Sequence, residues 1–99
     1  MDINQLMKQA QVMQKQLEET NKQISAMEFE GVASNGLVKV KCNGDYKVLS
    51  VSIDESILNK EDKEMIEDLI MIATNEAIDK VNNQKKEKFG NLAGGLGIR

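Results

Sequence analysis

An unbroken heptad repeat occupies the first quarter of the sequence and constrains the fold more than any other feature. Its seam consists of Ile3, Leu6, Ala10, Met13, Leu17, Thr20, Ile24 and Met27. The spacings alternate between three and four, which predicts one helix over about residues 3–28 with Asp2 as its N-cap. Lys8, Lys15 and Lys22 fall at the heptad position opposite the seam, about 10 Å apart along the axis. One face of this helix must therefore pack on a surface, while the other presents a row of ammonium groups.

Two Asn-Gly pairs, at residues 35–36 and 43–44, divide the next segment into three short stretches. Asn-Gly favours the two-residue type I′ turn of a β-hairpin, so we expect strands near residues 29–33, 37–42 and 46–53. Two-residue loops would pair Glu30 with Lys41, Val40 with Lys47 and Val38 with Leu49. One face of this antiparallel meander would then carry Val38, Val40, Leu49, Val51 and Ile53, and the other Lys39, Lys41, Tyr46 and Val48.

A second long helix is expected to follow a connector at residues 54–58. Asn59 is its predicted N-cap, with Asp62 completing a loose capping box, and Gly90 is its predicted end. A broad apolar stripe, formed by Ile66, Ile70, Ala73, Ala77 and Val81, suits packing on a sheet. The sequence therefore predicts one α+β domain over residues 1–90, ordered as long helix, three-stranded antiparallel meander and long helix, and a flexible glycine-rich tail over residues 91–99.

The lengths of the two helices predict a second chain. A helix of about 29 residues spans about 43 Å, whereas a compact domain of 100 residues has a radius of gyration near 13 Å. Both helices must overhang the body, and an overhanging apolar stripe needs a partner, so we expect a homodimer with coiled-coil contacts and a joined or stacked sheet. The expected interface residues are Ile3, Leu6, Ala10, Met13, Leu17, Val38, Val40, Leu49 and Val51.

Composition excludes several classes of function. The chain of 99 residues has no histidine and one cysteine, so a Cys/His zinc site and an intrachain disulfide are ruled out and Cys42 has no histidine to activate it. No apolar run approaches the length of a membrane span, and no signal peptide opens the chain, which predicts a cytoplasmic protein. We expect no catalytic residues, no cofactor, no metal and no small-molecule substrate.

Charge is distributed unevenly, although the total is only −3. Residues 54–68 carry two lysines against seven acidic residues, a net of −5, while residues 80–99 carry four lysines and Arg99 against Glu87, a net of +4. The acidic cluster is explained by the helix dipole, which favours negative charge in the first turns. The lysine stripe leaves two interpretations open on periodicity alone, a solvated face or a surface that binds phosphates. With few aromatic residues to stack on single strands, any nucleic-acid partner would be a duplex.

Several segments together resemble the YbaB/EbfC family of bacterial nucleoid-associated proteins. They are residues 6–15 (LMKQAQVMQK), residues 36–40 (GLVKV) with Asn43-Gly44, residues 62–70 (DKEMIEDLI) with Asn75-Glu76-Ala77, and Gly94-Gly95-Leu96-Gly97. The resemblance covers nearly the whole chain in the same order.

The resemblance implies a tweezer-like homodimer with protruding helices, located at the nucleoid. It also implies binding to duplex DNA with modest sequence preference, altering DNA conformation, nucleoid organisation and gene expression. It supplies only the protruding helices as the binding region; from charge and geometry we place DNA contacts on Lys8, Lys15 and Lys22, supported by Lys85, Lys86 and Lys88. The alternative is an interaction scaffold or a holdase-like chaperone, because helix–hairpin–helix order also resembles prefoldin subunits. Glu76 and Lys80 weigh against this alternative, since they interrupt the heptads of the second helix.

Overall fold

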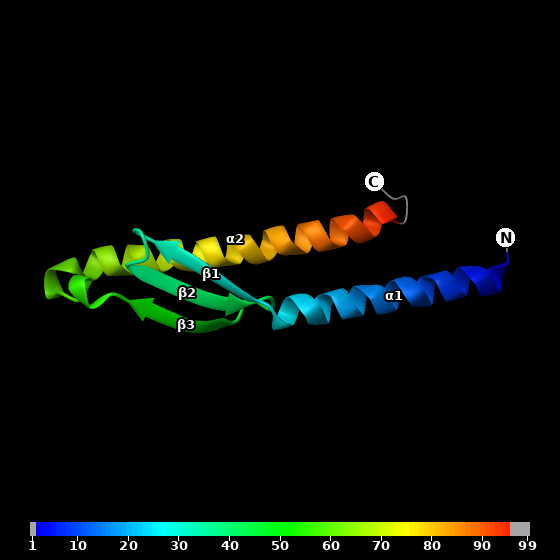
Figure 1. Cartoon of the computed structure of the whole chain (residues 1–99), viewed down its shortest axis with the longest axis horizontal. Helices are drawn as coiled ribbons and strands as arrows, with labels where there is room; N and C mark the ends of the chain where they lie inside the picture. The colour runs from blue at the N-terminus through cyan, green and yellow to red at the C-terminus, as the bar shows by residue number, and fades with distance from the viewer. Residues whose placement is uncertain (1, 96–99) are drawn as a thin grey trace.

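The computed structural model describes residues 2–95, with side chains described for residues 2–91. The chain forms a long helix, a three-stranded antiparallel sheet in the order β1-β2-β3, two short 3₁₀ turns and a second long helix (Figure 1). The bounds are α1 Ile3–Ala26, β1 Glu28–Ala33, β2 Val38–Asn43, β3 Val48–Ile53, η1 Glu55–Ile57, η2 Lys60–Asp62 and α2 Lys63–Gly95. This confirms the predicted α+β class and element order.

Helix α1 begins as predicted, because the Asp2 carboxylate accepts a hydrogen bond from the Asn4 backbone N–H at 3.1 Å. It ends at Ala26, where Met27 turns to extended backbone and leads directly into β1. Burial of the seam increases along the helix. Ile3 is 72% exposed, whereas Ile24 is buried against the sheet and α2. The helix is thus anchored at its C-terminal end and extends away from the body at its N-terminal end.

The first hairpin has the predicted register, with Glu30 opposite Lys41. Ser34 and Asn35 both have positive φ, as the central residues of a type I′ turn require, and the Gly36 N–H donates to the Ala33 carbonyl. The Asn-Gly signal therefore located this turn one residue too late without changing the strand pairing.

The predicted register of the second hairpin is wrong. Val40 pairs with Val51 and Val38 with Ile53, a shift of four residues. The Asn43 side chain explains three of these four residues, because its carbonyl accepts hydrogen bonds from the Asp45 and Lys47 N–H groups and so closes a three-residue loop instead of a two-residue one.

A bulge in β3 accounts for the fourth residue of this shift, because Cys42 pairs with Val48 while Lys41 pairs with Ser50. Since paired residues share a face, Val48 lies on the face of Cys42, which is not the face predicted for it. The shift of four preserves the predicted faces of Val51 and Ile53.

Both ends of α2 differ from the predictions. Asn59 precedes η2 and accepts no capping hydrogen bond with its side chain; its amide instead donates to the Asp62 carboxylate at 3.3 Å. The helix continues through Gly90 to Gly95, because one glycine costs a helix interior only about 1 kcal/mol and no proline follows to end it. Residues 91–95 of the predicted tail are therefore helical, and residues 96–99 lie outside the described residues.

Helix α2 packs across β1 and β2 at very short range. A Cβ atom on Gly31 would lie 1.9 Å from the Ala73 carbonyl oxygen and 2.6 Å from the Ala77 nitrogen, so only glycine fits there. The buried residues form two neighbouring clusters: Ile24, Phe29, Cys42, Ala77 and Val81, and Ala33, Val38, Val40, Ile57 and Ala73. No residue of β3 is fully buried, so α2 covers two of the three strands.

The molecule is elongated, with principal dimensions of 70 × 22 × 16 Å and a radius of gyration of 19.5 Å. A compact chain of this length would have a radius near 13 Å. Both helices extend from the sheet in the same direction, so the N- and C-terminal ends lie at the same end of the molecule (Figure 1). No helix in residues 2–95 combines the length and apolarity that crossing a membrane requires.

Replacing Gly31 with alanine tests the close packing of α2. We expect Gly31→Ala to lower the free energy of unfolding by about 2 kcal/mol, because the added methyl pushes the helix from the sheet. Gly90→Ala is the matched control, since its Cβ would meet nothing within 4 Å; it should raise stability by about 1 kcal/mol. Urea unfolding monitored by circular dichroism measures both. Equal effects of the two substitutions would contradict this packing.

Candidate nucleic-acid interface

The three lysines of α1 remain fully available to a partner. Lys8, Lys15 and Lys22 are exposed, on the face opposite the seam, whose last residue within α1 is Ile24. Ile24 packs with residues of α2, so the lysines point away from α2 and from the chain's own core. This places a straight row of positive charge along the outer face of one projecting helix.

The three lysines near the end of α2 are not equivalent. Lys86 and Lys88 are exposed, whereas Lys85 is half-buried with its Nζ 4.3 Å from the centre of the Tyr46 ring. The Tyr46 hydroxyl in turn donates a hydrogen bond to the Asn82 side-chain carbonyl. The structure thus puts the two predicted lysine sets on two arms that extend from the same end of the sheet (Figure 1).

Two of the residues predicted for a dimer interface lie in the core of the single chain. Val38 and Val40 are fully buried beneath the chain's own α2 and have no surface to offer. Strand alternation identified their face correctly, but it does not say which element covers that face. The remaining seven candidates are surface residues. Ile3, Leu6, Ala10, Leu49 and Val51 are exposed, and Met13 and Leu17 are half-buried.

Glu76 and Lys80 have a role that the sequence interpretation missed. The Glu76 carboxylate accepts a hydrogen bond from the Val32 N–H at 3.2 Å, and Lys80 Nζ donates to the Glu30 carbonyl at 2.7 Å. The two side chains also form an ion pair at 3.6 Å. They bond one N–H and one carbonyl on the outer edge of β1, which hinders the pairing of that edge with another strand. Their position in the seam of the second helix, where apolar residues are expected, was the sequence signal that could have indicated this role.

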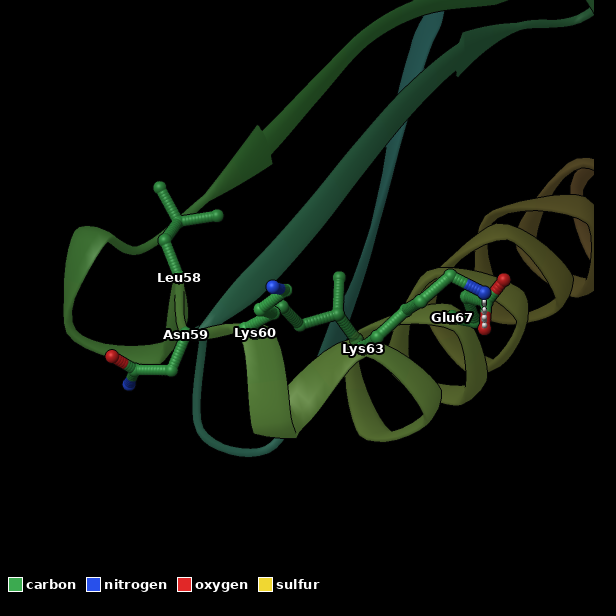
Figure 2. Close-up of a pocket in the computed structure, with 6 residues that line it drawn as sticks. Leu58, Asn59, Lys60, Lys63 and Glu67 are labelled. Atoms are coloured by element: carbon green, nitrogen blue, oxygen red, sulfur yellow. Dashed lines mark ion pairs between the residues drawn. The ribbon is translucent and has the colours of Figure 1, made fainter.

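The acidic end of the molecule lies at the opposite end from the two arm tips. A shallow hollow of about 430 Å³ occurs there, lined by Leu58, Asn59, Lys60, Lys63, Ile66 and Glu67 (Figure 2). Lys63 reaches along the helix to Glu67 in an ion pair of 3.5 Å. Nearby, hydrogen bonds from Ser56 lower the pKa of the Asp54 carboxyl, which caps η1. Lys63 and Glu67 pair with each other, and Asp54 caps η1. These charged groups therefore do not point together into the hollow.

Cys42 lies inside the core, and burial raises the pKa of its thiol. A raised thiol pKa lowers the fraction of reactive thiolate. Among the side chains of residues 2–91, no cluster of acidic and thiol groups could hold a metal ion. The surfaces with the chemistry to bind a partner are therefore the lysine-bearing arms and the exposed apolar residues of α1, β3 and the first half of α2, where Met65, Met71 and Ile72 are exposed.

Comparisons with known proteins agree with this geometry. A model of the YbaB/EbfC DNA-binding family matches residues 1–96. Nucleoid-associated proteins from two strains of Clostridium perfringens are each 40% identical over 97 residues, which cover 98% of this chain and 87% of each relative. The crystal structure of an uncharacterized protein from Helicobacter pylori aligns with a TM-score of 0.80 at 27% identity, covering 93% of this chain and 97% of the other.

Burial of Cys42 predicts that its thiol reacts slowly in the native protein. We expect alkylation by iodoacetamide at pH 8 to be at least about 100-fold slower than in denatured protein, because reaction requires opening of the core. Ser50→Cys in a Cys42→Ser background provides an exposed thiol in the same sheet and should react rapidly. If Cys42 and the thiol introduced at position 50 reacted at comparable rates in the folded proteins, Cys42 would be accessible.

Proposed function

This chain belongs to the YbaB/EbfC DNA-binding family, and from that premise we propose that it is a non-enzymatic nucleoid-associated protein. It binds duplex DNA as a homodimer with modest sequence preference and changes DNA conformation, and through this it affects nucleoid organisation and gene expression. Its location is the cytoplasm, at the nucleoid. The relatives from Clostridium perfringens carry the name nucleoid-associated protein, which supports the same assignment.

The observation that carries the proposal is the pair of projecting helices with exposed lysines. Lys8, Lys15 and Lys22 repeat every two turns along one face of α1, and Lys86 and Lys88 are exposed on α2. Lysine binds phosphate as a point charge without a fixed geometry, so such a row contacts the backbone of a duplex and reads little sequence. The acidic residues 54–68 lie at the end of the molecule opposite the arm tips (Figure 1), so they contribute little to the field around the arm lysines.

The homodimer is supported by apolar surface that the single chain leaves uncovered. Val48, Leu49 and Val51 on β3 are each about half exposed, on the strand that α2 does not cover. Since Glu76 and Lys80 hinder pairing at the β1 edge, the β3 side of the sheet is where a second copy would pack. The exposed seam residues of α1 would extend the same contact along the arm.

A holdase-like chaperone is the second candidate, and one observation favours it. Ile3, Leu6, Met7 and Val12 are exposed near the free end of α1, where a chaperone would hold unfolded clients. Suppression of the aggregation of a denatured client protein in the absence of DNA tests this function. Suppression without any affinity for duplex DNA would favour the chaperone over the DNA-binding protein.

Removing the α1 lysines tests the DNA-binding surface. If a dimer neutralises about six phosphates, the logarithm of affinity should fall with the logarithm of salt concentration with a slope near −5. Replacing Lys8, Lys15 and Lys22 with Gln should reduce the size of this slope and weaken binding at least about 10-fold for all duplex sequences. Fluorescence anisotropy of a labelled linear duplex measures both quantities.

The matched control is a triple substitution to Gln at Lys39, Lys41 and Lys60. Lys39 and Lys41 are exposed on the sheet, and Lys60 is exposed at the acidic end of the molecule. It removes the same charge but should keep binding within about threefold. A salt-independent affinity, or equal losses in the two triple variants, would contradict the proposed surface.

A charge on the uncovered face of β3 tests the dimer. Wild-type protein should sediment at twice the mass of one chain, and Val51→Asp should raise the dimer dissociation constant at least about 100-fold, because an unpaired carboxylate at an interface costs about 3 kcal/mol. Ser50→Asp is the control, on the same strand but on the opposite face, paired with Lys41. A monomeric wild type, or equal effects of the two substitutions, would contradict this interface.

A further inference from the structure

The loop between β2 and β3 is fastened to both arms. Its Asp45 carboxylate accepts a hydrogen bond from the Ser25 hydroxyl of α1 at 2.7 Å, and its Tyr46 hydroxyl donates to Asn82 of α2. Gly44 lies so close to α1 that a Cβ atom there would be 2.0 Å from the Ile24 carbonyl oxygen. The loop is therefore held between the C-terminal end of α1 and the middle of α2.

Tyr46 occupies a backbone conformation that its side chain disfavours. Its φ is +62°, at the third loop position, where glycine is the usual residue. A bulky residue with positive φ is an outlier, and such outliers are retained where the surrounding structure uses the side chain. Here the side chain makes two contacts with one face of α2, through its hydroxyl to Asn82 and through its ring to the Lys85 ammonium.

These contacts order the side chains of Lys85 and Asn82 and leave N–H donors on both that can bind an anion. The ring face attracts the ammonium electrostatically and restricts its long side chain, while N–H donors on the far side of the nitrogen stay free. Asn82 accepts from Tyr46 with its carbonyl, so its amide N–H₂ group is left as a donor. A side chain that is ordered before binding loses less conformational entropy when it binds. Lys86 lies one turn beyond Asn82 and is exposed, which adds positive charge beside the pair.

We propose that Tyr46, Asn82 and Lys85 form a preassembled contact for a DNA phosphate at the base of the α2 arm, in which Lys85 and Asn82 bind the phosphate and Tyr46 positions Lys85. The inference rests on the DNA-binding function proposed above and adds a site to it. Asp79, one turn before Asn82, and Asp45 in the loop are the neighbouring acidic groups. The Asp45 carboxylate already accepts a hydrogen bond from Ser25.

A double-mutant cycle on Tyr46 and Lys85 tests the proposal, with binding of a labelled duplex measured over a range of salt concentrations. Lys85→Gln should weaken binding about 5- to 10-fold and reduce the salt slope by about one for each Lys85 in contact. Tyr46→Asn, in which asparagine tolerates positive φ, should weaken binding about threefold. Tyr46→Phe keeps the ring and should stay within about twofold of wild type.

The decisive comparison is the double variant. If Tyr46 acts through Lys85, adding Tyr46→Asn to Lys85→Gln should change affinity by less than about twofold. Lys60→Gln, at the acidic end, is the charge-matched control and should bind as wild type does. Circular dichroism checks folding, and the comparison of Lys85→Gln with Lys60→Gln tests the phosphate contact without changing any residue of the loop.

Two outcomes would overturn the inference while leaving the proposed function intact. In one, Lys85→Gln behaves as Lys60→Gln does; in the other, the losses from Tyr46→Asn and Lys85→Gln add in full. Absence of binding by wild-type protein at low salt would instead contradict the proposed function itself, so the two failures are distinguishable.

Discussion

The close packing of α2 on β1 and β2 determines the rest of this structure. It depends on Gly31, where the helix backbone comes too near for any side chain, and on the small residues Ala73 and Ala77 that face it. One helix at this distance covers two strands, so β3 keeps exposed apolar side chains on its inner face. The helix is also much longer than the sheet is wide, so its second half projects beyond the core. A single packing contact thus leaves both an uncovered strand and a free arm.

In the proposed function, the uncovered strand and the free arm contact different partners. Apolar surface on β3 and along the α1 seam gains free energy when a second copy removes it from water, at about 25 cal/mol for each Å². The lysines on the outer face of α1 and near the end of α2 cannot be buried in such a contact without a large desolvation cost. In the proposed function, the same elements thus separate an apolar surface for self-association from a basic surface for DNA. Because Glu76 and Lys80 hinder pairing at the β1 edge, the β3 side of the sheet is favoured for association.

Periodic features of this fold could be predicted from sequence, and features that depend on contacts between distant segments could not. The heptads identified α1, and Asn35-Gly36 identified the first hairpin and its pairing. Asn43-Gly44 is the same dipeptide, yet the Asn43 side chain bonds to its own loop and selects a longer turn, which together with the bulge moves β3 by four residues. The lysines of the candidate site were visible as a pattern. The different environment of Lys85 could not be predicted, because its contact with Tyr46 joins residues 39 positions apart in the chain.

Lysine footprinting tests whether the two arms bind the duplex. Acetylation of each lysine is measured by mass spectrometry with and without linear duplex DNA at low salt. Protection should be confined to the arms and should disappear as salt is raised, while Lys60 and Lys63 at the acidic end react equally in both samples. The arm lysines expected to be protected are Lys8, Lys15, Lys22, Lys85, Lys86 and Lys88. Protection of Lys60 and Lys63, or unchanged reactivity of all the arm lysines when the duplex is bound, would contradict binding through the arms.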